Sequence, residues 1–293
     1  MTIQQFLDYL CLERNYSPLT VKSYGDDLRR FEAFFTSMDS GLTWETVDSD
    51  VIRDWMEHMM DSGNSASSVC RRLSALRSFY RYALMTGFVS HDPAHGIDGP
   101  RKSKPLPKYV REDDMRRLLD DYPWSDTYKD VRARTILLVF YETGVRVSEL
   151  VSLDDSDVDM SLSQIKVTGK RNKQRIVPFG NELAAALDHC AEVRDKTVPR
   201  LTSAFFASDK GLRMTAGQVR YIVKSRLSLV TTQPKRSPHV LRHTFATAML
   251  NHDAGIESVQ KLLGHASLST TEIYTHTTFE QLKRAYKKSH PRS

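Results

Sequence analysis

A single break in the apolar pattern divides this chain into two parts and limits the folds available to it. Over residues 91–108, HDPAHGIDGPRKSKPLPK, prolines, glycines and charges replace any helical or strand periodicity. The chain has 293 residues, enough for about two domains that each bury a core. We therefore expect a first domain over residues 1–98, a linker over 99–108 and a second domain over 109–293.

The first domain carries four helical patterns, in which apolar residues recur at intervals of three and four. These patterns cover residues 3–10, 21–35, 51–59 and 69–83. Ser17 and Pro18 are expected to open the second helix and Ser67 to cap the fourth. The first domain is therefore predicted to be a small helical bundle.

The second domain mixes strand and helix patterns. Alternating segments at 164–167 and 174–178 flank the basic turn TGKRNK, which indicates a β-hairpin with a cationic tip. Helical patterns cover residues 110–122, 131–143, 181–196, 216–230, 238–251, 256–263 and about 279–288. The predicted fold class is mainly α, with a small β-sheet or hairpin in the second domain.

Basic side chains are unevenly distributed along the chain. Residues 1–98 hold 9 Lys and Arg against 14 Asp and Glu, a net charge of −5, whereas residues 99–293 hold 33 against 22, a net charge of +11. The whole chain carries +6, which favours a polyanionic partner such as nucleic acid. We expect the second part to hold most of that partner.

Composition also excludes several classes of protein. The longest apolar run, residues 136–141, is far shorter than a membrane span of roughly 20 residues, so no membrane partner is expected. Asp8, Glu13 and Arg14 stand where a signal peptide needs an apolar stretch, which predicts a cytoplasmic protein. The three cysteines are far apart and indicate neither a disulfide framework nor a zinc site.

Four residues in distinctive local contexts are candidates for phosphate chemistry. His239 and Arg242 lie near the start of a predicted helix, where a phosphate would also meet free backbone N–H groups. Arg146 can offer its planar fork to two phosphate oxygens, and the alternative is an ion pair with Glu149. Lys170 at the hairpin tip can donate a proton, and the alternative is a solvated turn.

Tyr274 lies on a short Ser- and Thr-rich segment beyond Gly264 and His265. A tyrosine with a pKa of ~10 is a poor nucleophile at neutral pH, so it needs nearby cations or a base. The arginines and histidines named here would supply them. Packing in the core is the alternative interpretation of this tyrosine.

The fourth helix of the first domain has a basic face as well as an apolar one. Arg71, Arg77 and Arg81 lie opposite or beside the apolar stripe, together with two serines. These side chains are expected to reach DNA phosphates and to probe a groove. A solvated charged face is the alternative.

Taken in order, these motifs resemble those of tyrosine site-specific recombinases, the phage integrase family, and within it the XerC/XerD type. The resemblance spans nearly the whole chain. It is carried by FLDYLCLERNYSPLTVKSYGDDLRRFEAFF, TGVRVSELVSL, VTGKRNKQRIVPFG, SPHVLRHTFATAML, SVQKLLGHASLSTTEIYTH and FEQLKRAYKKSHPRS. It implies a helical SAM-like core-binding domain followed by an α+β catalytic domain.

The resemblance implies that Tyr274 attacks the scissile phosphate and forms a 3'-phosphotyrosyl link to DNA. Arg146 and Arg242 would hold the non-bridging oxygens and stabilise the charge of the transition state. No metal and no cofactor are expected, because fixed cations replace the metal ions of many nucleases. No ATP is expected either, because the phosphotyrosine conserves the energy of the broken bond.

The same resemblance implies proton-transfer roles. Lys170 would protonate the departing 5'-hydroxyl, His239 would exchange a proton with the nucleophile, and His265 would hydrogen-bond the phosphate. Arg171 stands where the family commonly has a small residue, which leaves Lys173 as a second candidate for the active lysine. Arg171 and Lys173 are also expected to contact DNA.

The implied partners are double-stranded DNA with a specific recombination site and further recombinase subunits. Such proteins clamp duplex DNA, and four protomers, identical or paralogous, join two duplexes. The C-terminal helix, with Leu282 and Tyr286 on its apolar stripe, would dock into a neighbour. Packing on its own domain is the alternative. Activation by the FtsK DNA translocase is a further expectation from the resemblance.

The function that the resemblance implies is strand exchange through a Holliday junction, which resolves chromosome dimers before cell division. A mobile-element integrase or a DNA invertase is an alternative with the same chemistry. A type IB topoisomerase would use the phosphotyrosine without exchanging partners. The non-enzymatic alternative is a DNA-binding module that has lost catalysis.

Overall fold

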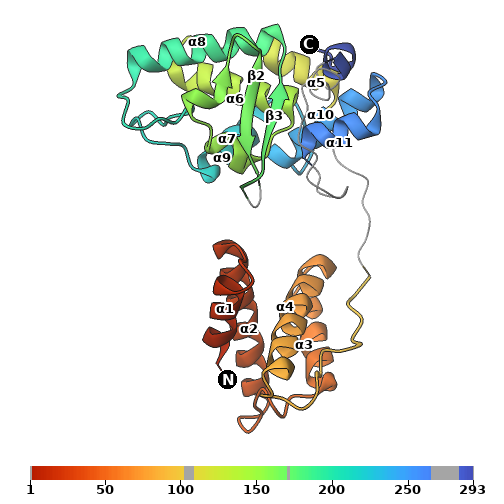
Figure 1. Ribbon diagram of the computed structural model, residues 1–293. Helices are drawn as coiled ribbons and strands as arrows, with labels where there is room; N and C mark the ends of the chain where they lie inside the picture. The colour runs from red at the N-terminus through yellow and green to blue at the C-terminus, as the bar shows by residue number, and fades with distance from the viewer. Residues whose placement is uncertain (1, 102–108, 170–171, 265–283, 293) are drawn as a thin grey trace. The chain divides into compact units, whose positions relative to one another are not determined.

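The computed structural model describes residues 2–101, 109–169, 172–264 and 284–292, and the chain separates into two compact units. Unit 1 comprises residues 1–105 and unit 2 comprises residues 106–293. Each unit has a hydrophobic core of its own. Figure 1 shows that the first unit is helical and that the second combines helices with a small sheet.

Unit 1 is built from helices α1 (Ile3–Leu12), α2 (Pro18–Met38), α3 (Ser49–Asp61) and α4 (Ala66–Met85). Their apolar faces meet in an aromatic core, in which the Phe31 ring lies 5.7 Å from that of Trp44 and 4.9 Å from that of Trp55. The predicted helical bundle is confirmed. The expected cap of the fourth helix was wrong: Ser65, not Ser67, is the N-cap, because its hydroxyl accepts a hydrogen bond from the Ser68 backbone N–H at 3.3 Å.

Unit 2 is organised around one helix that is buried on nearly all sides, α6 (Tyr128–Thr143). Even its polar side chains Arg132, Thr135 and Glu142 are buried. Helices α8 (Asn181–Thr197) and α10 (Pro238–Asn251) pack against it (Figure 1). Unit 2 also contains helices α5 (Glu112–Arg116), α7 (Val147–Val151), α9 (Ala216–Leu227) and α11 (Ile256–Leu263). No helix in the described ranges is long and apolar enough to cross a lipid bilayer.

The sheet of unit 2 is antiparallel, in the order β1 (Val158–Asp159), β2 (Gln164–Thr168) and β3 (Gln174–Pro178). Ile165 pairs with Val177, and Val167 pairs with Arg175, so these four positions share the inner face. The predicted hairpin is therefore present. Strand β1 was not predicted, because two residues are too few to show alternation. The prediction of a mainly α fold with a small sheet is confirmed.

Helix α6 begins at Tyr128, three residues before the predicted start, and two further helix predictions differ from the structure. Residues 110–122 do not form one α-helix, because α5 gives way to a π-helical segment, Arg117–Asp121, which the Tyr122 N–H closes on the Arg117 carbonyl at 3.0 Å. Helix α9 ends at Leu227 rather than at residue 230. There Leu229 donates to the Arg226 carbonyl at 3.1 Å, a three-residue turn that tightens the helix end.

The C-terminal residues 284–292 pack on unit 2, to which they belong. Residues 284–289 are helical, whereas the start of the predicted final helix lies outside the described residues. Tyr286 is buried, and its hydroxyl donates to the Glu142 carboxylate at 3.0 Å. Arg292 donates to Glu182 and to Asp120, both at 2.5 Å. For residues 284–292 the structure therefore shows packing on their own domain, which was the alternative to docking into a neighbouring subunit.

Candidate active site

Gly144 ends α6 and brings two of the predicted arginines to one place. Its φ of 59° is left-handed, and a Cβ atom there would lie 2.5 Å from Phe245 and 2.8 Å from Leu263, so only glycine fits. The Gly144 carbonyl accepts a hydrogen bond from Arg242 Nη1 at 2.7 Å. Arg146, two residues further along the chain, is the N-cap residue of α7.

Arg146 is partly exposed and already has internal partners. Its Nη1 donates to Glu149 Oε1 at 2.8 Å and its Nη2 to the Gly264 carbonyl at 3.2 Å. The ion pair with Glu149, the alternative weighed from sequence, is therefore present. The side chain is nevertheless 41% exposed, and its remaining N–H groups have no acceptor in the described part of the chain. The ion pair thus leaves donors for a phosphate.

Glu149 and Arg175 belong to the same cluster, and sequence reasoning did not assign either of them to the site. Arg175 donates to both carboxylate oxygens of Glu149, at 2.7 and 2.9 Å. Burial opposes ionisation of Glu149, but hydrogen bonds from Arg175 and its charge, followed by those of Arg146, lower the pKa of Glu149 to about 2. Glu149 is therefore a permanent anion at the centre of the cluster. The sequence does contain a signal for Arg175. Arg175 lies two residues from Val177, so the alternation of a strand places it on the same inward face of β3.

Arg242 projects from the first half of α10 and is 7% exposed. Its Nη2 donates to the Leu263 carbonyl at 2.5 Å, in addition to the bond to Gly144. Burial, followed by the charges of Arg146 and Arg175, lowers the pKa of Arg242 to about 10. The guanidinium is still a cation at neutral pH, and two backbone carbonyls hold it in place.

His239 lies in the first turn of α10, where its side chain is exposed. Its Nε2 is 3.2 Å from Nε2 of His243, one turn further along the same helix, and the two rings are 4.5 Å apart. One nitrogen must donate and the other accept, so this contact restricts the proton positions that His239 can adopt. Sequence reasoning named His239 and not its neighbour.

Lys170, Arg171, His265 and Tyr274 lie outside the described residues. The chain just before Lys170 and just before His265 borders the arginine cluster. A Cβ atom on Gly169, just before the hairpin tip, would lie 3.4 Å from Glu149 Oε1 and 4.0 Å from Arg146 Nη1. The Gly264 carbonyl, just before His265, accepts from Arg146.

Lys173 lies at the end of the hairpin turn with an exposed side chain, and its carbonyl accepts from the Gly169 N–H at 2.7 Å. The hairpin therefore closes directly beside the cluster.

The three arginines predicted to bind DNA on α4 have different surroundings. Arg71 donates to Ser23 at 2.7 Å and forms an ion pair with Asp27, which is 2% exposed. Arg77 donates to the Ile97 carbonyl. Arg81 is exposed and has no partner among the residues that the structure describes. The structure thus gives internal contacts to two of these side chains and leaves the third in solvent.

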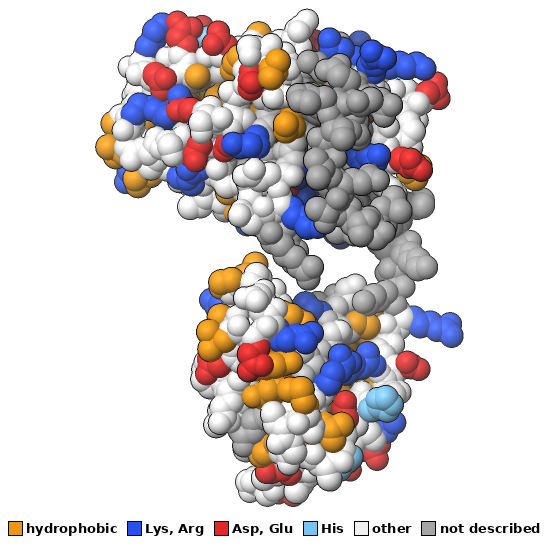
Figure 2. Space-filling model, in the orientation of Figure 1, with side chains coloured by type: hydrophobic (Ala, Val, Ile, Leu, Met, Phe, Trp, Pro, Cys, Tyr) orange, Lys and Arg blue, Asp and Glu red, His pale blue; other side chains and the backbone are white. Residues whose placement is uncertain are grey.

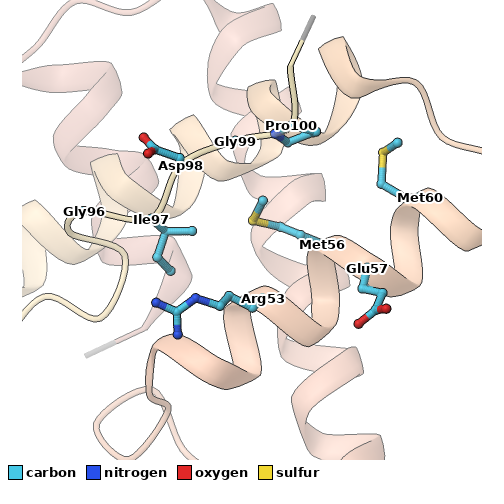
Figure 3. Close-up of a pocket in the computed structure, with 9 residues that line it drawn as sticks. All are labelled: Arg53, Met56, Glu57, Met60, Gly96, Ile97, Asp98, Gly99 and Pro100. Carbon is cyan, nitrogen blue, oxygen red and sulfur yellow. The ribbon is translucent and has the colours of Figure 1, made fainter.

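One open cavity of unit 1 does not involve the predicted catalytic residues. It has a volume of about 460 Å³ and lies between α3 and residues 96–100 (Figure 3). It is lined by Arg53, Met56, Glu57, Met60, Gly96, Ile97, Asp98, Gly99 and Pro100. The arginine cluster of unit 2 is therefore the better candidate for the active site.

The chemistry of the cluster is that of a fixed anion-binding site. Arg146, Arg175 and Arg242 together with Glu149 leave an excess of two positive charges at the ends of α6, α7 and α11. Guanidinium groups held in place by carbonyls and a carboxylate can stabilise a phosphate without reorganising. The cluster therefore offers fixed cations of the kind that can hold a phosphate.

Comparison with known proteins gives the family. The model of the phage integrase family matches residues 108–281, and that of the family's N-terminal SAM-like domain matches residues 3–87. The chain is 38% identical to the tyrosine recombinase XerC of Pelotomaculum thermopropionicum, over 99% of this chain and 98% of that protein. It is 39% identical to the tyrosine recombinase XerD of Pseudomonas aeruginosa, over 99% and 97%.

Among solved structures, the site-specific recombinase XerH bound to palindromic difH substrate has a TM-score of 0.74 at 22% identity, over 97% of this chain and 84% of that chain. This likeness concerns the fold. The chain belongs to the phage integrase family and is a tyrosine recombinase, an enzyme that breaks and rejoins DNA. The resemblance predicted from the motifs is confirmed.

Proposed function

We propose that this chain exchanges strands between two short DNA sites and thereby resolves chromosome dimers before cell division. The observation that carries the proposal is the convergence of Arg146 and Arg242 on one site, where the chain enters the segment that holds Tyr274. The similarity to both XerC and XerD over nearly the whole chain supports the cellular role.

The proposed reaction begins when the Tyr274 hydroxyl oxygen attacks the scissile phosphorus. A bond forms between this oxygen and phosphorus, and the bond from phosphorus to the 5'-oxygen breaks. His239 takes the tyrosine proton, and Lys170, or Lys173 in its place, gives a proton to the departing 5'-oxygen. A 5'-hydroxyl from the second duplex then reverses these steps, which forms the Holliday junction without consuming ATP.

The charge that develops in the transition state is assigned to Arg146, Arg242 and His265. A pentacoordinate phosphorane carries more negative charge than the bound diester, so cations that are already in place stabilise it preferentially. The burial of Arg242 supports this role, because a guanidinium at a site of low dielectric acts more strongly than one in water.

We assign the two parts of the chain separate tasks on DNA. Residues 1–98 are the core-binding domain, 99–108 the linker and 109–293 the catalytic domain, and together they hold double-stranded DNA that contains a specific recombination site. Among the predicted DNA contacts that the structure describes, Arg81 and Lys173 have exposed side chains that form no ion pair with another described residue, which supports this assignment. The net charge of +11 on residues 99–293 supports binding mainly by the catalytic domain.

Strand exchange needs four active sites, so we propose a tetramer on two duplexes, formed by this chain alone or with a paralogue. We further propose a cytoplasmic location and activation by the FtsK translocase, as for a recombinase that acts on the chromosome.

The test is covalent capture on a nicked suicide DNA that carries candidate sites from the host's replication terminus. We expect a protein–DNA band on a denaturing gel, and its loss in Tyr274→Phe. Tight DNA binding without a covalent band, when the true sites and any paralogue are present, would contradict the proposal and favour a non-catalytic DNA-binding role.

Two alternatives share the chemistry and are separated by their substrates. A mobile-element integrase or a DNA invertase would act on sites outside the terminus region. A type IB topoisomerase would relax supercoiled plasmid that carries no recombination site. The proposal expects no relaxation of such a plasmid, together with a recombinant product that appears only when two sites are present.

A further inference from the structure

Arg175 connects three elements that surround the candidate phosphate site. It lies on β3 and is 7% exposed. Its Nη1 and Nη2 donate to Glu149 on α7, and its Nε donates to the Leu262 carbonyl near the end of α11 at 2.9 Å. One side chain therefore links the hairpin to the element that starts at Arg146 and to the helix that precedes His265.

The carboxylate of Glu149 is fully occupied by this arrangement. An ionised carboxylate accepts about four hydrogen bonds. Glu149 receives two from Arg175, one from the Arg146 backbone N–H at 2.7 Å and one from Arg146 Nη1. Only one of these four uses the Arg146 guanidinium. A second N–H of that guanidinium, on Nη2, donates to the Gly264 carbonyl, and the others are available to another anion.

Removal of the Arg175 guanidinium would change which groups donate hydrogen bonds to Glu149. Both Glu149 oxygens would lose a partner while the carboxylate stayed buried, and an unpaired buried charge is strongly unfavourable. The nearest other cation is Arg146, whose Nη1 already lies 2.8 Å from Oε1. A two-point pair between Arg146 and Glu149 would satisfy the carboxylate and take the donors that a phosphate needs.

We propose that Arg175 is a positioning residue that holds Glu149 from the hairpin side and so keeps the Arg146 guanidinium available to the scissile phosphate. This inference rests on the proposed function, because it takes Arg146 as a phosphate ligand. The packing around the pair is close: a Cβ atom on Gly264 would lie 3.2 Å from Arg175 Cδ. There is little room for a substitute side chain to find other partners.

The test uses Arg175→Lys, which keeps the positive charge and loses the planar fork. We expect the single-turnover rate of adduct formation on suicide DNA, at saturating protein, to fall about a hundredfold. The dissociation constant for DNA should stay unchanged, since Arg175 is not proposed to touch DNA. Loss of rate with unchanged affinity is the signature of a displaced catalytic group.

Arg194→Lys is the matched control, because it also replaces a buried guanidinium by an ammonium group. Arg194 is 3% exposed in the same unit and pairs with Asp155 and Asp195, which are not part of the proposed site. We expect this variant to lose stability as Arg175→Lys does and to keep the wild-type rate of adduct formation.

The double variant Arg175→Lys with Glu149→Gln distinguishes a role of Arg175 in positioning Arg146 from a purely structural role. Without its negative charge, residue 149 competes less for Arg146, so the rate should recover about tenfold relative to Arg175→Lys. A purely structural role predicts that the double variant is slower still, because a second buried partner is lost.

Three results would overturn the proposal: a wild-type rate in Arg175→Lys, an equal loss of rate in Arg194→Lys, or a double variant slower than Arg175→Lys. The wild-type adduct and its dependence on Tyr274 are measured first. A wild-type protein that forms no adduct contradicts the proposed function, and this inference with it.

Discussion

Gly144 joins α6 to the N-cap arginine of α7 in a conformation that tolerates no side chain. We expect Gly144→Ala to lower the free energy of unfolding of unit 2 by about 2–5 kcal/mol. Left-handed backbone strain contributes about 1–2 kcal/mol of this and overpacking against Phe245 and Leu263 about 1–3 kcal/mol. Urea unfolding followed by circular dichroism measures the loss.

Gly63→Ala is the control, because Gly63 has a similar φ of 78° and no atom within 4 Å of an added Cβ. It should show the strain alone, about 1–2 kcal/mol, in the transition of unit 1. If the two substitutions lower stability equally, close packing is not the reason for glycine at position 144.

Sequence reasoning found the charged residues that stand in local motifs and missed those defined by contacts between distant segments. Arg146 and Arg242 were predicted from their positions near helix starts, and the structure brings them together. Glu149 was considered only as an ion-pair partner, and Arg175 was not considered. Their pairing joins β3 to α7 across 26 residues of sequence, a contact that no helical or strand periodicity encodes.

At the level of elements, two of the arginines on α4 differ in their surroundings. Arg81 is exposed, whereas Arg77 donates to the Ile97 carbonyl. We expect Arg81→Ala to reduce the slope of log K against log salt for DNA binding by about 1, because one phosphate contact is lost. Fluorescence anisotropy at several NaCl concentrations measures the slope. An unchanged slope would remove Arg81 from the DNA interface.

The contrast with Arg77 serves as an internal control. Arg77→Ala should lower the melting temperature of unit 1, because a partly buried hydrogen bond to the Ile97 carbonyl is lost. Arg81→Ala should leave the melting temperature unchanged. If Arg77→Ala changes the salt slope of DNA binding but not the melting temperature, Arg77 contacts DNA in place of the Ile97 carbonyl in the complex.

The C-terminal helix contributes a pH dependence through Glu142, which accepts from the Tyr286 hydroxyl. Burial raises the pKa of Glu142 to about 8, well above its value in the unfolded chain. Between about pH 4.5 and pH 8 the folded state keeps a proton that the unfolded state has lost. The free energy of unfolding therefore falls as pH rises through this window, by up to about 1.4 kcal/mol per pH unit from this group.

We expect Glu142→Gln to flatten the pH dependence and to be more stable than wild type at pH 8. Urea unfolding between pH 6.5 and pH 8.5 tests this. The range avoids the opposite effect of His290, whose burial lowers its pKa to about 4 and which costs stability only as pH falls below 6.5. Parallel pH profiles for variant and wild type would contradict the assignment.

Element boundaries were predictable where the sequence marks both ends. Helices α10 and α11 have their predicted bounds, because Ser237 and Pro238 open the first and Gly264 ends the second. No such marker lies within residues 110–122, where the helix changes to π geometry. The apolar pattern there indicates burial, and it does not specify the hydrogen-bond register.

At the scale of the whole molecule, net charge predicts which part of the chain binds DNA but not which face. On the face seen in Figure 2, Lys and Arg side chains of unit 2 are intermixed with acidic ones. Helix α9 is more informative, because Arg220 and Lys224 are exposed one turn apart, and Tyr221 beside them is 74% exposed. An exposed aromatic residue between two cations is a suitable surface for a nucleic-acid backbone.

We therefore expect the double variant Arg220→Ala with Lys224→Ala to reduce the salt slope of DNA binding by about 2, and to weaken binding to specific and unrelated DNA alike. The control is Lys129→Ala with Lys196→Ala, which removes two exposed lysines at the start of α6 and the end of α8. Both variants lower the net charge equally. If the control reduces the slope as much, long-range attraction by the whole charge explains DNA binding. A difference between them would locate the phosphate contacts on α9.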